Sequence, residues 1–174
     1  MWLDSKRSFG EHVARVAPKA RRVANNLARL LPNIGGASGG ARRLYVATVL
    51  SVLLYAAPIW WEKVGKSPHL SRQMAAAQRI IANKAARAYR TVSHVGAITF
   101  AAVSPVILIS KSYAETYETV KEIRSRLGEV PARARRMLKL QTKETLLRNW
   151  EAFLANPQLA GRRVREAVQP VLAE

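Results

Sequence analysis

The sequence predicts an all-α protein, an irregular bundle of six or seven helices around a buried apolar central helix. Several segments repeat apolar residues at steps of three and four, the spacing that places them on one face of a helix. No stretch alternates apolar and polar residues with the period of a strand. Residues 44–61 form a long uncharged stretch that the flanking amphipathic segments are able to cover.

The uncharged stretch of residues 44–61, LYVATVLSVLLYAAPIWW, has two interpretations. As one helix it spans about 27 Å, close to the hydrocarbon thickness of a membrane, and its tyrosines and tryptophans suit a membrane interface. However, Thr48 and Ser51 are polar, Pro58 interrupts the last turn, and the segments on both sides carry apolar stripes that need a partner. We therefore expect a buried central helix and no membrane partner. A basic helical protein anchored in a membrane by residues 44–61 is the alternative.

An amphipathic helix is expected over residues 9–31, before the uncharged stretch. Pro18 lies inside this helix and should kink or divide it. Four glycines within residues 35–40 then predict a mobile turn, and Ser38 is a candidate N-cap for the central helix. The apolar face of the first helix consists of Phe9, Val13, Val16, Ala20, Val23, Leu27 and Leu30. Its basic face consists of Arg15, Lys19, Arg22 and Arg29.

Another amphipathic helix is expected from Pro68 to about Arg90, because Ser67 is a good N-cap and proline is favoured at the first helical position. A short helix should follow in the small, apolar residues 91–103, where Gly96 allows a neighbour to approach closely. The longer helix is expected to bury Leu70, Met74, Ala77, Ile81, Ala85 and Ala88. Its opposite face presents Arg72, Arg79, Arg87 and Arg90.

Three further helices are expected after residue 103. Ser104-Pro105 opens a helix that runs to about Leu127, and Gly128 ends it. Pro131 begins the next helix, and a last one follows Asn156-Pro157. The apolar stripe of the helix after Pro131 consists of Leu140, Leu147, Trp150 and Leu154.

A domain boundary is expected at the turn before Pro131. We predict a helical core over residues 1–127 and a basic helical extension over residues 128–174. Basic residues crowd the first three turns of the helix after Pro131, where they oppose the helix dipole, so helix stability alone does not explain them. These residues are Arg133, Arg135, Arg136, Lys139 and Lys143.

The chain carries a large positive charge. With 29 Lys and Arg against 11 Asp and Glu, the formal net charge is +18. A surplus of this size repels itself unless a polyanion neutralises it, so nucleic acid is the expected partner and an anionic membrane surface is the competing one. The absence of cysteine from the sequence excludes disulfides and thiolate metal sites.

Residues suited to catalysis or metal binding are sparse. Asp4 is the only aspartate, and the glutamates are scattered along polar faces, whereas two-metal phosphoryl transfer requires carboxylates that converge. His12, His69 and His94 lie far apart in the sequence, each without a partner at metal-ligand spacing. The glycine-rich turn lacks the Lys-Ser/Thr ending of a phosphate loop. We predict no catalytic residue, no metal and no cofactor.

The basic helical faces are the candidate binding surface. A charged face is often only solvated, but acidic residues at helical spacing that would balance these stripes are almost absent. Rows of Lys and Arg along helices suit phosphate backbones, and the scarcity of aromatic residues on the basic faces favours a duplex over a single strand. The predicted nucleic-acid contacts are Arg15, Lys19, Arg22, Arg29, Arg42, Arg43, Arg72, Arg79, Arg87 and Arg90.

Five short motifs, in order and with their spacing kept, resemble a known family. They are Leu3-Asp4, Phe9 to His12, Arg42 to Tyr45, Leu53 to Trp60, and Ala88 to Ser93. This combination is similar to the segment that follows the polymerase palm in jockey-like, LINE-type non-LTR retrotransposon reverse transcriptases. The resemblance covers about residues 2–110 and fades after residue 111.

The resemblance implies that the chain is the C-terminal part of a retrotransposon RNA-directed DNA polymerase. Residues 1–127 would then form a thumb-like core that binds a template–primer duplex, RNA–DNA or DNA, without polymerising, because the family's Tyr/Phe-x-Asp-Asp metal box is not in this sequence. The parent polymerase's palm and fingers would be its partners, and an intracellular, nuclear location is implied. A translated remnant without function is a further alternative.

Overall fold

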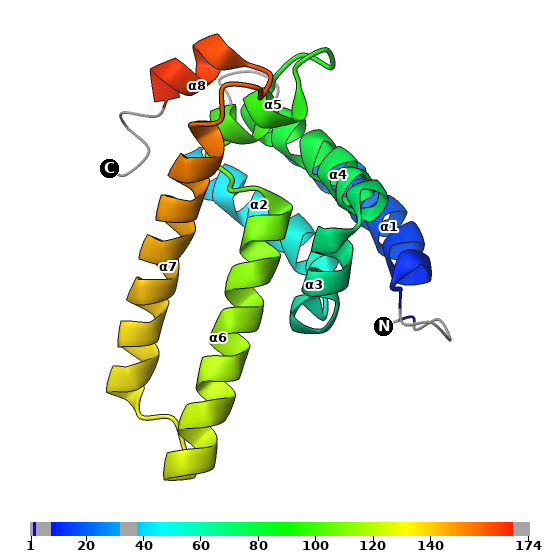
Figure 1. Cartoon of the computed structure of the whole chain (residues 1–174). Helices are drawn as coiled ribbons and strands as arrows, with labels where there is room; N and C mark the ends of the chain where they lie inside the picture. Colours follow the sequence, from blue (N-terminus) through cyan, green and yellow to red (C-terminus); the bar gives the residue numbers. More distant parts are fainter. Residues whose placement is uncertain (1, 3–7, 32–37, 169–174) are drawn as a thin grey trace.

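Helices dominate the computed structural model, which describes residues 2, 8–31 and 38–168. Within these residues there are eight helices and no strand, so the all-α prediction is confirmed. Leu3-Asp4 and residues 35–37 of the predicted glycine-rich turn lie outside the described residues. The helices are α1 (Gly10–Ala28), α2 (Gly39–Leu53), α3 (Ala57–Lys66), α4 (Pro68–Ala86), α5 (His94–Phe100), α6 (Val106–Leu127), α7 (Ala132–Leu154) and α8 (Arg162–Val168) (Figure 1).

The uncharged stretch is two helices and not one, which corrects the prediction of a single central helix and accounts for the additional element. The axes of α2 and α3 differ by 79°. Pro58 lacks the N–H that would bond the Leu54 carbonyl in a continuous helix, and its ring would clash with that carbonyl. Ala56 adopts a left-handed conformation (φ 59°), and the Ala57 N–H bonds the Leu54 carbonyl instead, at 3.0 Å. The indole Nε1 of Trp60 donates to the Tyr55 carbonyl at 2.8 Å and so closes the bend.

Burial of the uncharged stretch is also one-sided, whereas a buried central helix was expected. Leu44, Tyr55 and Ile59 are exposed to 69%, 58% and 57%. In the part of the chain that the structure describes, no single helix has the length and apolar character to cross a membrane; the bent pair α2–α3 meets that criterion of length and composition only when taken together. The buried face of the stretch consists of Tyr45, Val49, Leu53, Leu54, Ala57 and Trp60.

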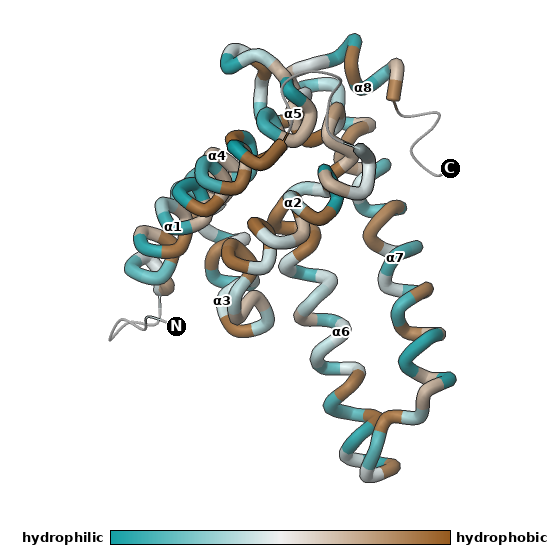
Figure 2. The backbone as a smooth tube through the Cα atoms, turned by 180° about the vertical axis from the view of Figure 1, so that it is seen from behind, coloured by the Kyte–Doolittle hydropathy of each residue, from teal (hydrophilic) through white to brown (hydrophobic). Residues whose placement is uncertain are grey.

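The core forms where α1 and α4 lie side by side and α2 packs against both (Figure 1). Apolar residues are dense along α2 and α3 (Figure 2), and α3 packs in turn on the first half of α6. The predicted stripe of α4 is buried from Leu70 to Ala85. That of α1 is buried from Phe9 to Ala20 and then emerges, so that Leu30 is 77% exposed.

Pro18 neither divides α1 nor ends it. Proline leaves the carbonyl four residues earlier, that of Ala14, without its helical donor. Both Pro18 and Ala14 are exposed, so water is able to reach that carbonyl. The expected division does not occur because the missing hydrogen bond lies on the solvent side of the helix.

Gln78 joins three helices through one buried amide. Its Nε2 donates to the Ser104 carbonyl at 2.7 Å, and its Oε1 accepts the Val106 N–H at 2.8 Å. The same Oε1 lies 3.0 Å from Nε2 of His94, and because an amide oxygen only accepts, the imidazole must donate there. Gln78 of α4 therefore caps the start of α6 and fixes the tautomer of His94 on α5.

The long helices α6 and α7 form a hairpin that extends away from the other helices (Figure 1). Gly128 ends α6 with φ 75°, as its position predicted, and the turn to α7 follows. The contact between the two helices includes a hydrogen bond of 3.0 Å between the Thr116 and Thr142 hydroxyls. The predicted domain boundary falls in this turn, while the second half of α7 packs back on α5 through Trp150 and Leu154.

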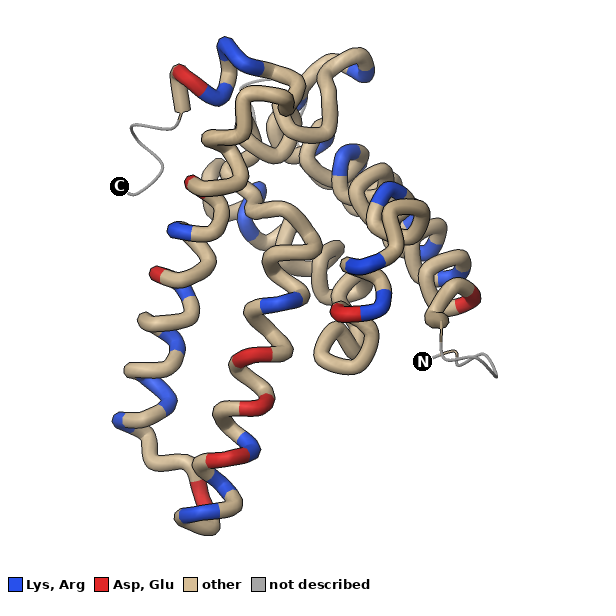
Figure 3. The backbone as a smooth tube through the Cα atoms, viewed as in Figure 1, with Lys and Arg blue, Asp and Glu red and all other residues tan. Residues whose placement is uncertain are grey.

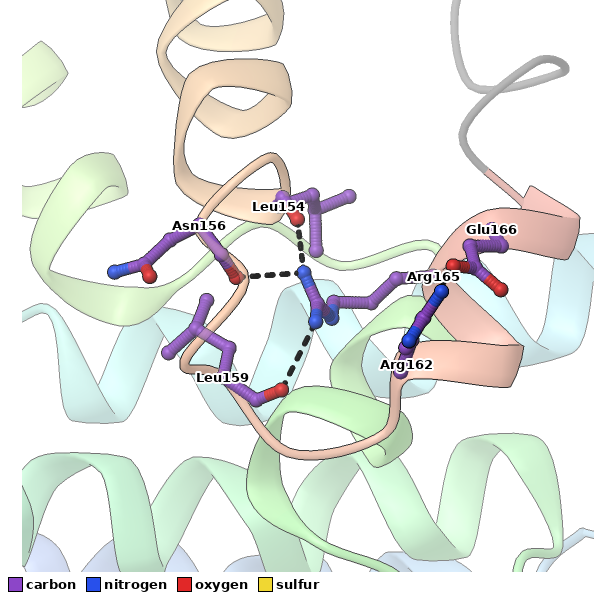
Figure 4. Close-up of polar contacts among 6 residues, drawn as sticks. All are labelled: Leu154, Asn156, Leu159, Arg162, Arg165 and Glu166. Carbon is purple, nitrogen blue, oxygen red and sulfur yellow. Dashed lines mark hydrogen bonds and ion pairs between the residues drawn. The ribbon is translucent and has the colours of Figure 1, made fainter.

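Arg165 fastens α8 to the end of α7 (Figure 4). Its guanidinium donates to the carbonyls of Leu154, Asn156 (2.8 Å) and Leu159 (2.9 Å), and the residue is only 5% exposed. A buried cation at a helix C-terminus interacts favourably with the dipole there. Gly161 lies against Gly96 of α5, where an added Cβ would be 3.5 Å from the Gly96 backbone, which confirms the expected close approach.

We predict that Trp60→Phe destabilises the fold by about 1–2 kcal/mol, because it removes the donor to the Tyr55 carbonyl at the bend. Trp61→Phe is the control, because it makes the same change of side chain at a partly buried position for which no such hydrogen bond is seen. Urea unfolding followed by circular dichroism measures both. Equal losses in the two variants would contradict a role for this hydrogen bond.

We also predict that stability falls on acidification. Burial lowers the pKa of His94 to about 4, and the positive charge of Arg79 acts in the same direction. In the unfolded chain His94 binds a proton below pH ~6.5, whereas in the folded chain it binds one only below pH ~4. The contribution of His94 to the free energy of unfolding is therefore fully present above pH ~6.5. It is lost as the pH falls from ~6.5 to ~4, by at most about 1.4 kcal/mol per pH unit.

His94→Asn keeps an N–H donor for Gln78 and should flatten this dependence in urea titrations at several pH values. His69→Asn is the control, because His69 lies on the surface, bonded to Gln73 at 2.8 Å. An unchanged pH profile in the His94 variant would refute the assignment.

Candidate nucleic-acid interface

The basic row of α1 lies on the solvent side of that helix. Lys19, Arg22 and Arg29 are exposed, and no described carboxylate lies within 4 Å of them. They span about 15 Å along the helix at 1.5 Å per residue. Arg15 begins the row but is engaged, because its Nε lies 2.5 Å from Oε1 of Glu11 and its guanidinium 5.5 Å from the ring centroid of Trp2. Three of the four predicted contacts on α1 are thus available to a ligand.

The two basic residues predicted on α4 itself, Arg72 and Arg79, have different roles. Arg72 is exposed, as the periodicity predicted. Arg79 is only partly exposed, and its guanidinium donates to the Val92 carbonyl at 2.7 Å and to the Arg90 carbonyl at 2.5 Å. Arg79 therefore holds the turn between α4 and α5 with two of its N–H donors.

Arg42 and Arg43 of α2 lie apart from the other candidates. They line a cavity of about 460 Å³ together with apolar side chains that include Phe100, Ile109 and Leu146. This places them on the side of α2 that faces α6 and α7. Arg43 is exposed, while Nε of Arg42 is buried without a hydrogen-bond partner among the described residues.

The turn after α4 carries the last two candidates. α4 ends at Ala86, earlier than predicted, because Arg87 adopts a left-handed conformation with φ 54°. Arg87 and Arg90 are both exposed, and between them lies Tyr89, exposed to 85%. Tyr89 was not among the predicted contacts, although an aromatic residue between two arginines is a signal that the sequence itself contains.

The charges are unevenly distributed over the molecule. Between Glu11 and Glu115 the sequence has a single acidic residue, Glu62, and this pairs with Lys66 at 2.5 Å. The Lys66 ammonium lowers the pKa of Glu62. Figure 3 shows Lys and Arg along the outer edge formed by α1 and α4, while most of the described acidic residues lie on the α6–α7 hairpin. The α1–α4 edge is therefore suited to a polyanion.

The α6–α7 hairpin has a more mixed character. The acidic residues of α6 pair with basic neighbours one turn away, for example Glu122 with Arg126 at 2.6 Å. The basic cluster at the start of α7 is exposed, and no described carboxylate lies within 4 Å of it. Its members are Arg133, Arg135, Arg136, Lys139 and Lys143.

The three histidines lie in different environments. His12 is fully buried between the rings of Trp2 and Trp60, with centroid distances of 5.9 and 6.2 Å, and burial lowers its pKa. His69 contacts Gln73 on the surface, and His94 belongs to the Gln78 network. Among the described residues, no group of three or more His, Asp or Glu lies close enough together to hold a metal ion.

No family model, no curated protein and no solved structure matches this chain. The resemblance to non-LTR reverse transcriptases therefore stays a prediction. Several of the residues that carry it lie at joints of the fold: Phe9 precedes α1, Pro58 and Trp60 form the bend between α2 and α3, and Ser93 caps α5 by accepting the Gly96 N–H at 3.1 Å.

We predict that Arg79→Met destabilises the protein by about 2 kcal/mol, because two backbone carbonyls lose a charged donor. Arg72→Met, on the same helix, should change stability by less than about 0.5 kcal/mol because that side chain is exposed. Thermal or urea unfolding of the two variants measures the difference. Equal stability would show that Arg79 does not hold the turn.

Proposed function

We propose that this chain is a thumb-like helical module that binds a nucleic-acid duplex through its phosphate backbone. The observation that carries the proposal is the exposed row of Lys19, Arg22 and Arg29 on α1, next to α4, in a part of the chain with almost no acidic residue. Such a row supplies affinity and register for phosphates without reading base sequence.

The resemblance to retrotransposon reverse transcriptases supports the choice of ligand. In that setting the duplex is the template–primer, RNA–DNA or DNA, held in the nucleus together with the palm and fingers of the parent polymerase. Some of the residues that carry the resemblance lie at helix joints, where backbone geometry limits which side chains fit. Pro58, at the bend between α2 and α3, is an example. We propose binding without catalysis for the isolated chain.

The alternative function, a membrane-associated basic protein, is favoured by the exposed apolar side chains of the bent α2–α3 pair, among them Leu44 and Ile59. Flotation of the purified chain with anionic liposomes separates the two proposals. Protein that floats with the liposomes and ignores duplex would replace the leading proposal with this one.

For the leading proposal, the expected result is a strong dependence of duplex affinity on salt. If about six phosphates are neutralised, log Kd should change with log salt at a slope near 5 for duplex DNA. The variant Lys19→Gln/Arg22→Gln should lower this slope by about 2. Fluorescence anisotropy titrations at several salt concentrations measure both values.

A control variant, Arg133→Gln/Arg136→Gln, removes the same charge from α7 and should leave the slope closer to that of the wild type. Absence of binding, or a flat salt dependence, would refute the proposal. A slope lowered equally by the two variants would refute the assignment to α1.

A further inference from the structure

The turn between α4 and α5 has a fixed conformation. Arg79 donates to the carbonyls of Arg90 and Val92 from inside the turn. The Val92 N–H bonds the Tyr89 carbonyl at 3.0 Å, and the Ala88 N–H bonds the Asn83 carbonyl at 2.9 Å. The backbone that carries the side chains of this turn is thus held in place before any ligand binds.

Tyr89 projects from this turn into solvent. At 85% it has the largest exposed fraction among the large apolar and aromatic side chains of the described residues. A tyrosine so exposed contributes little to the core, and a ring on a rigid turn loses little conformational entropy when a ligand covers it. Substitution of Tyr89 should therefore change the stability of the fold little, and its ring is accessible to a flat ligand.

The surroundings of Tyr89 favour an anionic partner. Arg87 and Arg90 flank it and are exposed, and the sequence has no acidic residue between Glu62 and Glu115. A flat, polarisable group next to negative charges is the description of an unpaired nucleotide base beside its phosphates. Aromatic side chains stack on any base, and neighbouring arginines bind phosphate.

We propose that Tyr89 stacks on an unpaired base at the end of, or at a break in, the bound duplex, while Arg87 and Arg90 contact the adjacent phosphates. The inference rests on the proposed function, because the α1 row binds the paired part of the same nucleic acid. It adds a preference that the electrostatic row alone does not supply. The chain should bind a duplex with a single-nucleotide overhang more tightly than a blunt duplex.

The test uses the full chain and two short DNA duplexes, one blunt and one whose overhanging nucleotide is a fluorescent purine analogue. Binding of the wild type should quench the analogue, and the overhang should be bound about tenfold more tightly than the blunt end. Tyr89→Leu should remove both effects and keep the salt dependence of blunt-duplex binding, while Tyr89→Trp should retain them. Tyr117→Leu, which alters an exposed tyrosine of α6, is the matched control and should behave as the wild type.

The outcomes separate the two proposals. If the wild type binds both duplexes with the expected salt dependence but Tyr89→Leu keeps the quenching and the preference, the stacking inference is overturned and the proposed function stands. If the wild type binds neither duplex, the proposed function fails and the inference fails with it. Equal loss in the Tyr89→Leu and Tyr117→Leu variants would also overturn the assignment to this turn.

Discussion

The bend between α2 and α3 determines where the later helices lie. A continuous helix over residues 44–61 would carry the chain straight on, past the helices that now cover it. Pro58 prevents this, and the 79° change of direction lets α3 pack on α6 and returns α4 to the side of α1. Two of the carbonyls freed at the bend, those of Leu54 and Tyr55, each find a donor, in the Ala57 N–H and the Trp60 indole.

The same device recurs at the other joints. Helix ends leave backbone groups without partners, and in this protein long polar side chains from a neighbouring element satisfy them. Gln78 reaches from α4 to the start of α6, Arg79 reaches from α4 to the next turn, and Arg165 reaches from α8 to the end of α7. Each joint combines an apolar contact with a directional polar one, because apolar packing alone does not specify how two helices are connected.

The use of some basic side chains in joining helices determines which cations are available to a ligand. The basic residues fall into two groups. Some, such as Arg79 and Arg165, donate hydrogen bonds that join helices, and others, such as Lys19 and Arg22, are exposed to solvent. Only the second group is able to neutralise a polyanion. Because the acidic residues are concentrated on the α6–α7 hairpin, the exposed cations of α1 and α4 act on a ligand without nearby carboxylates to oppose them.

The sequence by itself determined the local features of this protein. Helical periodicity found the buried faces of α1 and α4, and capping residues located helix ends, as shown by Ser38 and Ser67 accepting the N–H groups of Ala41 and Leu70. These features depend on neighbours three or four residues away in the sequence, so residue spacing alone predicts them.

Only the tertiary structure decided which candidates are free to bind a ligand. Arg72 and Arg79 share a residue type and a helical face, yet Arg79 meets two carbonyls more than ten residues away and Arg72 meets solvent. The exposure of Tyr89 was decided in the same way, because it lies on a turn whose carbonyls accept hydrogen bonds from Arg79. The contact between a side chain and a distant carbonyl depends on how the chain turns at Pro58 and after α4, and no local spacing encodes that path.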